Sequence, residues 1–215
     1  AMGGHHSKVA SPALSAQRLD PDMTELEKAA AGLLYDANFD PDVLEKRLVA
    51  KRILHELNGL HPDEADRRDA LLRGLLGKAG ERMTFDGHFH CDYGFNIELG
   101  EDFYANVNLV ILDGAKVTIG RNCFIAPNVG IYTAGHPLDA QRRNRGLEYA
   151  RPVTIGDDVW IGAGVSILPG AVIGSGAVIA AGSVVRGTIP ERVICGGNPA
   201  RVIREIGEQD DLRYR

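Results

Sequence analysis

The chain has no long hydrophobic run, no excess of basic residues and only three cysteines among its 215 residues. A transmembrane helix needs about 20 consecutive apolar residues, and no such stretch occurs. Lysine and arginine number 24 against 29 aspartates and glutamates, so the net charge is −5. A general nucleic-acid binder would show a basic face. We therefore expect neither a membrane nor a nucleic acid among the partners.

The three cysteines, Cys91, Cys123 and Cys195, have no metal-ligand spacing and suggest no disulfide framework. We predict a reduced, cytoplasmic location. The first twenty residues lack a signal-peptide core, and the opening AMGGHHSK looks like an expression tag. His5 and His6 are therefore not counted as ligands, and residues 1–21 are assigned to a tag or disordered leader.

The sequence does contain an aliphatic residue at every sixth position near its C-terminus. A helix needs apolar spacings of three and four, whereas a two-faced strand alternates every second residue. A strict period of six with recurrent glycine or alanine is typical of a β-solenoid, in which short strands and corners wind about an axis. The repeated positions are Ile155, Ile161, Ile167, Ile173, Ile179 and Val185.

The same period extends upstream. Ile119, Ile125 and Ile131 keep the step, and Ile155 follows Ile131 by four periods of six. An earlier run, Leu99, Ala105 and Ile111, is offset by a two-residue insertion near 113–114. If three hexads close one triangular turn, each turn uses about 18 residues, which predicts roughly five to six turns. We predict an all-β solenoid core over residues 81–198.

Residues 22–80 lack the period of six and carry helix-capping signals, which predict a small helical cap. The TELE segment at 24–27 is a capping box that opens one helix. Asp40-Pro41 opens a second helix, which Asn58-Gly59 ends. We expect 61–63 to start a third. This cap could cover the first coil, which solenoids need, or shape a substrate pocket, or do both.

The repeat is interrupted by TAGHPLDAQRRNRGLEYARP, between Ile131 and Ile155. Insertions in solenoids form surface loops, and such loops often carry function. His136 stands at the mouth of this loop and could act as a general base near neutral pH. A base needs an acceptor at its other ring nitrogen. Glu148 is the best candidate for this acceptor, and Asp139 is the second.

Four segments together resemble the maltose and galactoside O-acetyltransferases, with nodulation-factor and xenobiotic acetyltransferases more distant. They are YDANFD at 35–40, the stretches 91–113 and 131–170, and GGNPARVIREI at 196–206. The resemblance runs from about residue 24 to 206. It implies a left-handed parallel β-helix with an N-terminal helical cap, a long loop inserted in one coil, and a C-terminal tail at 199–215.

The resemblance also implies an activity and an assembly. The expected reaction is direct transfer of an acetyl group from acetyl-CoA to a sugar hydroxyl, with no metal, in a homotrimer whose sites lie between subunits. His136 falls on the catalytic base and Asn106 on a residue that aligns the base with the acceptor. Matches to acceptor-binding positions are Asp36, Asn38, Asp92 and Tyr104.

On the donor side, Trp160 matches a tryptophan that walls the acyl-donor site. Gly162 and Ala163 offer backbone groups near the thioester, where an N–H could stabilise an oxyanion. The resemblance also implies a pantetheine path along Ala181 and Gly182, and donor phosphates near Arg201 and Arg204, whose guanidinium groups suit phosphate. Alternatively, both arginines belong to a solvated C-terminal segment.

The chain departs from the family pattern at Gly114, where the galactoside enzymes have a second aspartate. This favours maltose-type or other acceptors. The family often has serine or glycine in place of Ala163, so only its main-chain role is implied. Position 148 varies, so a Glu148–His136 pairing rests on charge and proximity in the sequence.

Other readings stay open. No cysteine or serine lies beside a base in a recognisable motif, so we expect no covalent acyl-enzyme; Cys123 is the possible exception and is expected to be core or surface filler. A γ-type carbonic anhydrase would need three zinc-binding histidines. His88 and His90 are close together, but they precede the clear repeats. A third possibility is a non-catalytic solenoid. The acceptor itself could be maltose, glucose, a galactoside, a lipo-oligosaccharide or an antibiotic.

Overall fold

A computed structural model describes residues 22–211. The leader assigned to 1–21, with His5 and His6, lies outside these residues. The predicted capping box opens α1 (Glu25–Ala30), and Asp40 caps α2 (Pro41–Asn58), which Gly59 ends. All three predictions are confirmed. The next helix, α3 (Ala65–Leu75), begins later than expected because 61–64 form a turn closed by a 3.0 Å bond from the Glu64 amide to the His61 carbonyl.

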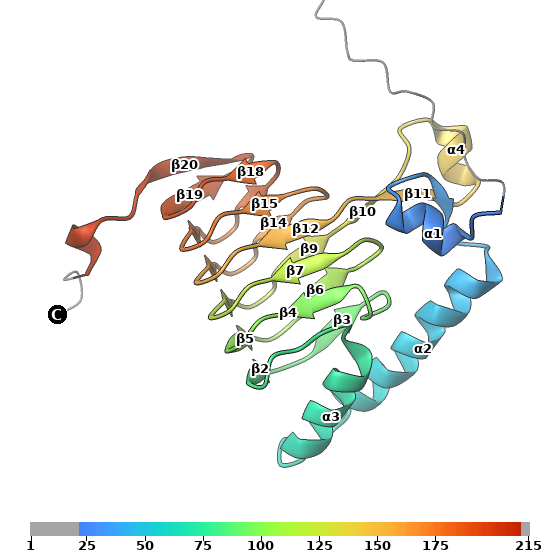
Figure 1. Cartoon of the computed structure of the whole chain (residues 1–215), viewed down its shortest axis with the longest axis horizontal. Coiled ribbons are helices and arrows are strands. Elements are labelled where there is room, and N and C mark those ends of the chain that lie inside the picture. The colour runs from blue at the N-terminus through green and yellow to red at the C-terminus, as the bar shows by residue number, and fades with distance from the viewer. Residues whose placement is uncertain (1–21, 212–215) are drawn as a thin grey trace, which may run out of the picture.

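Parallel strands form a three-sided β-helix (Figure 1). The first face holds β2 (Met83–Phe85), β5 (Phe103–Ala105), β8 (Phe124–Ile125), β13 (Trp160–Ile161), β16 (Val178–Ile179) and β19 (Val193–Gly197). The second face holds β3 (Phe89–Cys91), β6 (Leu109–Leu112), β9 (Gly130–Tyr132), β14 (Ser166–Ile167) and β17 (Val184–Val185). The third face holds β4 (Ile97–Leu99), β7 (Val117–Ile119), β12 (Val153–Ile155), β15 (Val172–Ile173) and β18 (Thr188–Ile189).

The chain visits the first, second and third faces in turn, completes five turns and begins a sixth at β19. This agrees with the predicted number of turns. Within the predicted C-terminal tail at 199–215, β20 (Ala200–Glu205) folds back and pairs antiparallel with β19.

The core of the β-helix consists of the in-phase aliphatic residues. All twelve predicted positions, from Leu99 to Val185, are at most 1% exposed. They stack in register from coil to coil, as where Ile155 pairs with Ile119 on one side and Ile173 on the other. Glycine is needed where coils touch at a corner: a Cβ on Gly162 would lie 2.6 Å from the amide nitrogen of Ala181. The period of six therefore arises from two requirements: a buried aliphatic residue in each strand and a small residue at each tight corner.

The helical cap covers the N-terminal end of this core. Leu54 and Leu57 of α2 join Leu72 and Leu75 of α3 in the same buried cluster as the first coil. The Asn58 side chain fixes the contact: its amide donates to the Phe89 carbonyl at 2.9 Å and its oxygen accepts from the Phe89 amide at 3.0 Å. Other aliphatic residues of α2 stay outside this cluster, since Leu44 and Leu48 are 40% and 41% exposed.

The long insertion between β9 and β12 is a structured projection. It contains β10 (Ala134–Gly135), α4 (Ala140–Asn144) and β11 (Leu147–Ala150), and β1 (Tyr35–Asp36) from the cap adds a third strand (Figure 1). Asp139 caps α4, because its carboxylate accepts from the Arg142 amide at 2.9 Å. It is therefore not the partner of His136, which corrects the second of the two candidates.

Candidate active site

His136 follows β10 and is held by the neighbouring strand β11. Its Nδ1 lies 3.2 Å from the carbonyl oxygen of Leu147, and its Nε2 lies 3.9 Å from a carboxylate oxygen of Glu148. A carbonyl can only accept, so Nδ1 carries a proton, and in the neutral ring Nε2 presents the lone pair. The group that orients the ring is thus a backbone carbonyl. Glu148, expected in that role, lies instead on the side of the basic nitrogen.

Glu148 is mostly buried and its second carboxylate oxygen accepts a hydrogen bond from Tyr35 at 3.3 Å. Tyr35 is 1% exposed. Burial, together with the nearby Tyr93 and Glu148, raises the pKa of Tyr35. The phenol therefore stays protonated and donates to the carboxylate.

Asp92 lies at the corner after β3 and faces the cap. The Nε of Arg47, on α2, is 3.9 Å from its carboxylate. The same guanidinium donates to the Tyr93 hydroxyl at 3.2 Å and lies over the Tyr93 ring. Burial raises the pKa of Asp92 to about 6, with Arg47 opposing the shift and the carboxylates of Asp113 and Glu148 adding to it.

The buried carboxylate of Asp113, which immediately precedes Gly114, stabilises the corner that carries Asp92. This carboxylate accepts from four backbone amides, those of residues 92, 93, 94 and 96, at 2.8–3.3 Å. Arg47, Tyr35 and Asp113 were not predicted from the sequence as site residues. Arg47 and Tyr35 come from the cap, and only the tertiary fold brings them to this corner.

Asp36 and Asn38 support the same region through local contacts. One oxygen of Asp36 accepts from the amides of Asn38 and Phe39 at 3.1 and 2.9 Å. The Asn38 side chain donates to the Gly146 carbonyl at 2.9 Å. Asp36 thereby fixes the turn after β1, and Asn38 ties this turn to the inserted loop that carries His136.

Asn106 and the residues expected at the donor thioester lie at a different corner. Asn106 follows β5, donates to the Tyr104 hydroxyl at 3.2 Å and accepts from the Val107 amide at 2.8 Å. In later coils the same corner carries Gly162, Ala163, Ala181 and Gly182. The Gly162 amide donates to the Ile179 carbonyl at 2.8 Å, so it is engaged in the coil-to-coil ladder and is not free to serve an oxyanion.

Within one chain, the predicted site residues therefore fall into two groups, at two different corners of the β-helix. We call the corner between the first and second faces the Asn106 corner, and that between the second and third faces the His136 corner. The first holds Asn106 and the donor-side glycines and alanines; the second holds His136, Glu148 and Asp92. The strands of the second face stand between them, so a single chain does not bring Asn106 to His136.

Trp160 points outward from the first face and is 56% exposed, next to Phe124, which is 55% exposed. The two arginines of β20 differ from one another. Arg204 makes two bonds to the Asp210 carboxylate, at 2.8 and 2.7 Å, whereas Arg201 donates to the adjacent Ala200 carbonyl at 3.0 Å. Arg204 is thus already held by a carboxylate of its own chain.

Cys123 lies inside the β-helix with 0% exposure. Burial raises the pKa of its thiol to about 11. A buried thiol that resists ionisation is a poor nucleophile, so its predicted place as core filler is confirmed.

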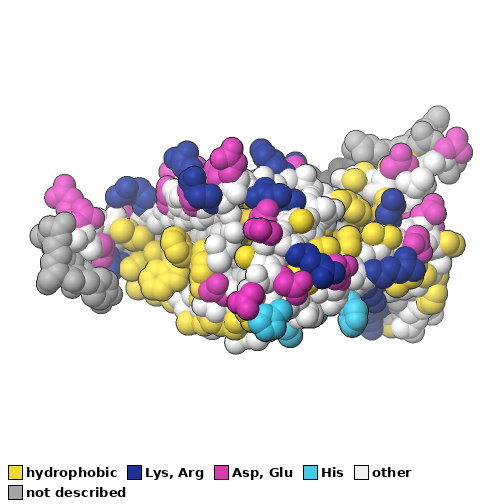
Figure 2. Space-filling model, turned by 90° about the horizontal axis from the view of Figure 1, so that it is seen from below, with side chains coloured by type: hydrophobic (Ala, Val, Ile, Leu, Met, Phe, Trp, Pro, Cys, Tyr) yellow, Lys and Arg dark blue, Asp and Glu magenta, His cyan; other side chains and the backbone are white. Residues whose placement is uncertain are grey.

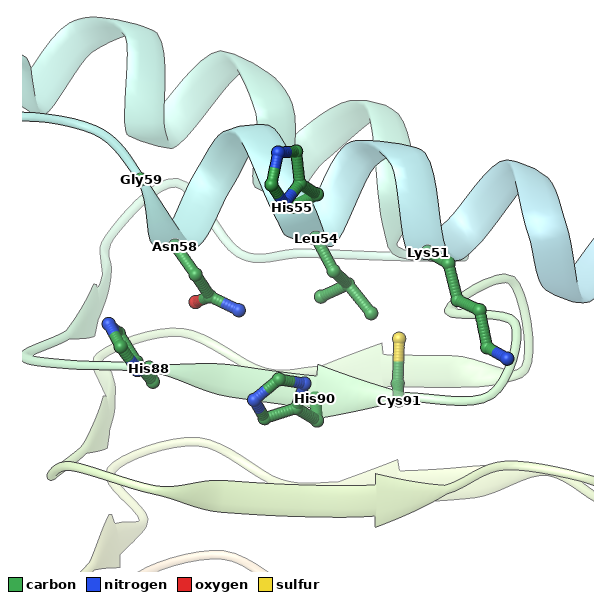
Figure 3. Close-up of a pocket in the computed structure, with 8 residues that line it drawn as sticks. All are labelled: Lys51, Leu54, His55, Asn58, Gly59, His88, His90 and Cys91. Carbon is green, nitrogen blue, oxygen red and sulfur yellow. The ribbon is translucent and has the colours of Figure 1, made fainter.

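A separate hollow lies between α2 and β3 (Figure 3). None of the predicted catalytic residues lines it. His88 and His90, the histidines of the carbonic anhydrase alternative, stand on its strand side. Within residues 22–211, no three histidine, cysteine or acidic side chains are grouped so that they could hold a metal ion. The lining residues are Lys51, Leu54, His55, Asn58, Gly59, His88, His90 and Cys91.

Charges of both signs are interspersed over the face seen in Figure 2, which shows no field of a single sign. Among the described helices, none combines the length and apolar character needed to cross a membrane.

Comparisons with known proteins agree with this architecture. A family model for the maltose acetyltransferase hexapeptide capping motif matches residues 28–80, and one for the bacterial transferase hexapeptide repeat matches residues 152–187. A putative acetyltransferase of Saccharomyces cerevisiae is 59% identical over 188 residues, covering 87% of this chain and 96% of its own.

Two solved structures are also similar. A maltose O-acetyltransferase from Clostridium difficile 630 superposes with a TM-score of 0.84 at 48% identity, covering 86% of this chain and 99% of its own. A galactoside acetyltransferase in complex with coenzyme A superposes with a TM-score of 0.86 at 42% identity, covering 90% of this chain and 96% of its own. The fold is thus the left-handed β-helix of the hexapeptide-repeat acyltransferases. Within that class, the chain belongs to the family of the galactoside and maltose O-acetyltransferases.

Proposed function

We propose that this protein transfers the acetyl group of acetyl-CoA to a hydroxyl of a maltose- or glucose-like sugar, with His136 as general base. The observation that carries the proposal is the fixed tautomer of His136. Its Nδ1 is tied to the Leu147 carbonyl, so its Nε2 is ready to take a proton. The similarity to an acetyltransferase bound to coenzyme A supports the choice of donor.

The acetyl group passes directly from donor to acceptor, without a covalent acyl-enzyme. As the acceptor oxygen attacks the acetyl carbonyl, its proton passes to Nε2 of His136. The carbon–sulfur bond then breaks, and His136 returns the proton to the leaving thiolate. The Glu148 carboxylate, 3.9 Å from Nε2, stabilises the imidazolium that forms between these events. Since Gly162 is engaged in the ladder, the amide of Ala163 is our candidate oxyanion donor.

The donor lies along the Asn106 corner and the first face. Trp160 offers an exposed aromatic wall. Ala181 and Gly182 keep the surface beneath the pantetheine arm free of large side chains. Arg201 is the better placed of the two arginines to meet the donor phosphates, because Arg204 must first leave Asp210.

The acceptor is bound at the His136 corner by Asp92, with Asp36 and Asn38 shaping the wall and Tyr104 contributing from the Asn106 corner of a neighbouring subunit. Carboxylates beside a half-exposed histidine suit a ligand rich in hydroxyl groups, which can donate to them. Gly114 provides no side chain there, which favours maltose-like over galactoside acceptors.

A homotrimer completes the site. Asn106 and His136 occupy different corners of one chain, so a neighbouring subunit must supply Asn106 to each His136. Flat β-helix faces allow such packing about a threefold axis. A cytoplasmic location stays a prediction from the three free cysteines.

The test is thiol release from acetyl-CoA in the presence of a panel of acceptors: maltose, glucose, a galactoside, a chitin oligosaccharide and a hydroxylated antibiotic. We expect the highest kcat/KM with maltose or glucose and an acetylated product in mass spectra. No thiol release with any acceptor would favour a non-catalytic solenoid, and stoichiometric zinc would revive the carbonic anhydrase reading.

A further inference from the structure

Tyr35 joins the helical cap to the catalytic loop through its hydroxyl. It lies on β1, which pairs antiparallel with β11 so that Tyr35 stands opposite Glu148. Its hydroxyl donates to one carboxylate oxygen of Glu148 at 3.3 Å, and the other oxygen lies 3.9 Å from Nε2 of His136. A continuous set of contacts therefore runs from the cap to the basic nitrogen.

The phenol is confined. Tyr35 is 1% exposed and packs in a small cluster of its own with Ala29, Ala37, Ala115 and Ala150. These small side chains leave room for the ring and no large neighbour that could take its place. Tyr35 is also the largest side chain of that cluster, so its position depends on the alanines around it and on the bond to Glu148.

The hydroxyl of Tyr35 also takes the space of a side chain at position 114. A Cβ built on Gly114 would lie 2.9 Å from the Tyr35 hydroxyl and 3.3 Å from the Cβ of Ala150. Contacts this short force the neighbour to move. Any side chain at 114 would therefore push the hydroxyl, and the most direct consequence is loss of its bond to Glu148.

We infer that Tyr35 is a positioning residue, which holds Glu148 beside His136 and requires glycine at position 114 in order to do so. The inference rests on the proposed function, since it assigns Tyr35 a part in that reaction. It also gives a physical reason for the departure at Gly114. The Tyr35 hydroxyl, which comes from the cap and binds Glu148, occupies the space that a side chain at position 114 would need.

The first test is a double-mutant cycle of Tyr35→Phe and Glu148→Gln. Loss of a hydrogen bond to a charged group is expected to lower kcat about tenfold for Tyr35→Phe, with KM for acetyl-CoA unchanged. The double variant should be no slower than Glu148→Gln alone, because both changes break one unit. Tyr132→Phe, which removes a phenol oxygen from the second face, is the matched control and should retain wild-type kcat.

The second test replaces Gly114 with alanine in two backgrounds. Gly114→Ala should lower kcat about as much as Tyr35→Phe, and lower the midpoint of thermal unfolding. In the Tyr35→Phe background, Gly114→Ala should lower kcat little further, since the hydroxyl that it would displace is absent.

The outcomes separate the two proposals. Full kcat in Tyr35→Phe, or losses that simply add in either cycle, would overturn the role of Tyr35 and leave the acetyltransferase assignment standing. A wild-type protein that acetylates no acceptor would overturn both.

Discussion

The Nδ1 of His136 and the carbonyl oxygen of Leu147 lie 3.2 Å apart, across the hairpin formed by β10 and β11. This contact leaves Nε2 as the basic nitrogen. Replacing His136 with alanine should lower kcat by about 10²- to 10⁴-fold, the usual contribution of general acid–base catalysis. His61, an exposed histidine of the cap, provides a control: His61→Ala should change kcat little. Turnover of His136→Ala within a few-fold of the wild type would remove His136 as the base.

Glu148 should contribute less than His136, because it stabilises a charge and takes no proton. Glu148→Gln keeps the shape and removes the charge that lies 3.9 Å from Nε2. We expect kcat to fall about tenfold, the order of a partly screened ion pair near the surface. Steady-state kinetics at saturating acetyl-CoA measure this directly, and unchanged turnover would show that the pairing plays no part.

Trp160 tests the donor side. Trp160→Ala removes an exposed aromatic face, and KM for acetyl-CoA should rise about tenfold, since an aromatic contact and its buried area are lost together. KM for the acceptor should stay the same. Val172→Ala, an exposed residue on the third face, is the control. An equal rise in both KM values would argue against a donor-specific wall.

The raised pKa of Asp92 leads us to expect that acceptor binding depends on pH. Burial raises the pKa of Asp92 to about 6, so this carboxylate, which we propose accepts from a sugar hydroxyl, becomes protonated as the pH falls through this value. KM for the acceptor should therefore rise between pH 7 and pH 5, whereas Asp92→Asn should show a high KM that varies little with pH. A wild-type KM that is flat over this range would contradict the assignment.

The same shift predicts an effect of Asp92 on stability. A carboxyl whose pKa is higher in the folded than in the unfolded state favours folding in its protonated form. Its contribution is fully present below the unfolded value near 3.8 and is lost as the pH rises through about 6. Asp92→Asn, which stays neutral, should therefore raise the free energy of unfolding at pH 8 by about 3 kcal/mol. Urea unfolding at pH 8 measures this; a less stable variant would contradict it.

Much of the fold could be predicted because its signals are local and repeated. Each in-phase aliphatic residue is buried, and the box at Thr24 and the cap at Asp40 form as expected. The orienting group of His136 could not be predicted, since it is the carbonyl of Leu147 and every residue has one. Tyr35 and Arg47 were missed for a different reason: they reach the site only through pairing of β1 with β11 and packing of α2.

We propose that His136 of one subunit works with Asn106 of another. The direct test is to coexpress His136→Ala and Asn106→Ala chains with different tags and to purify the mixed trimers. Each variant alone should be nearly inactive. In any mixed trimer one of the three sites combines an intact His136 with an intact Asn106, so we predict about one third of wild-type kcat per trimer. Mixed trimers as inactive as the two parents would contradict the shared site.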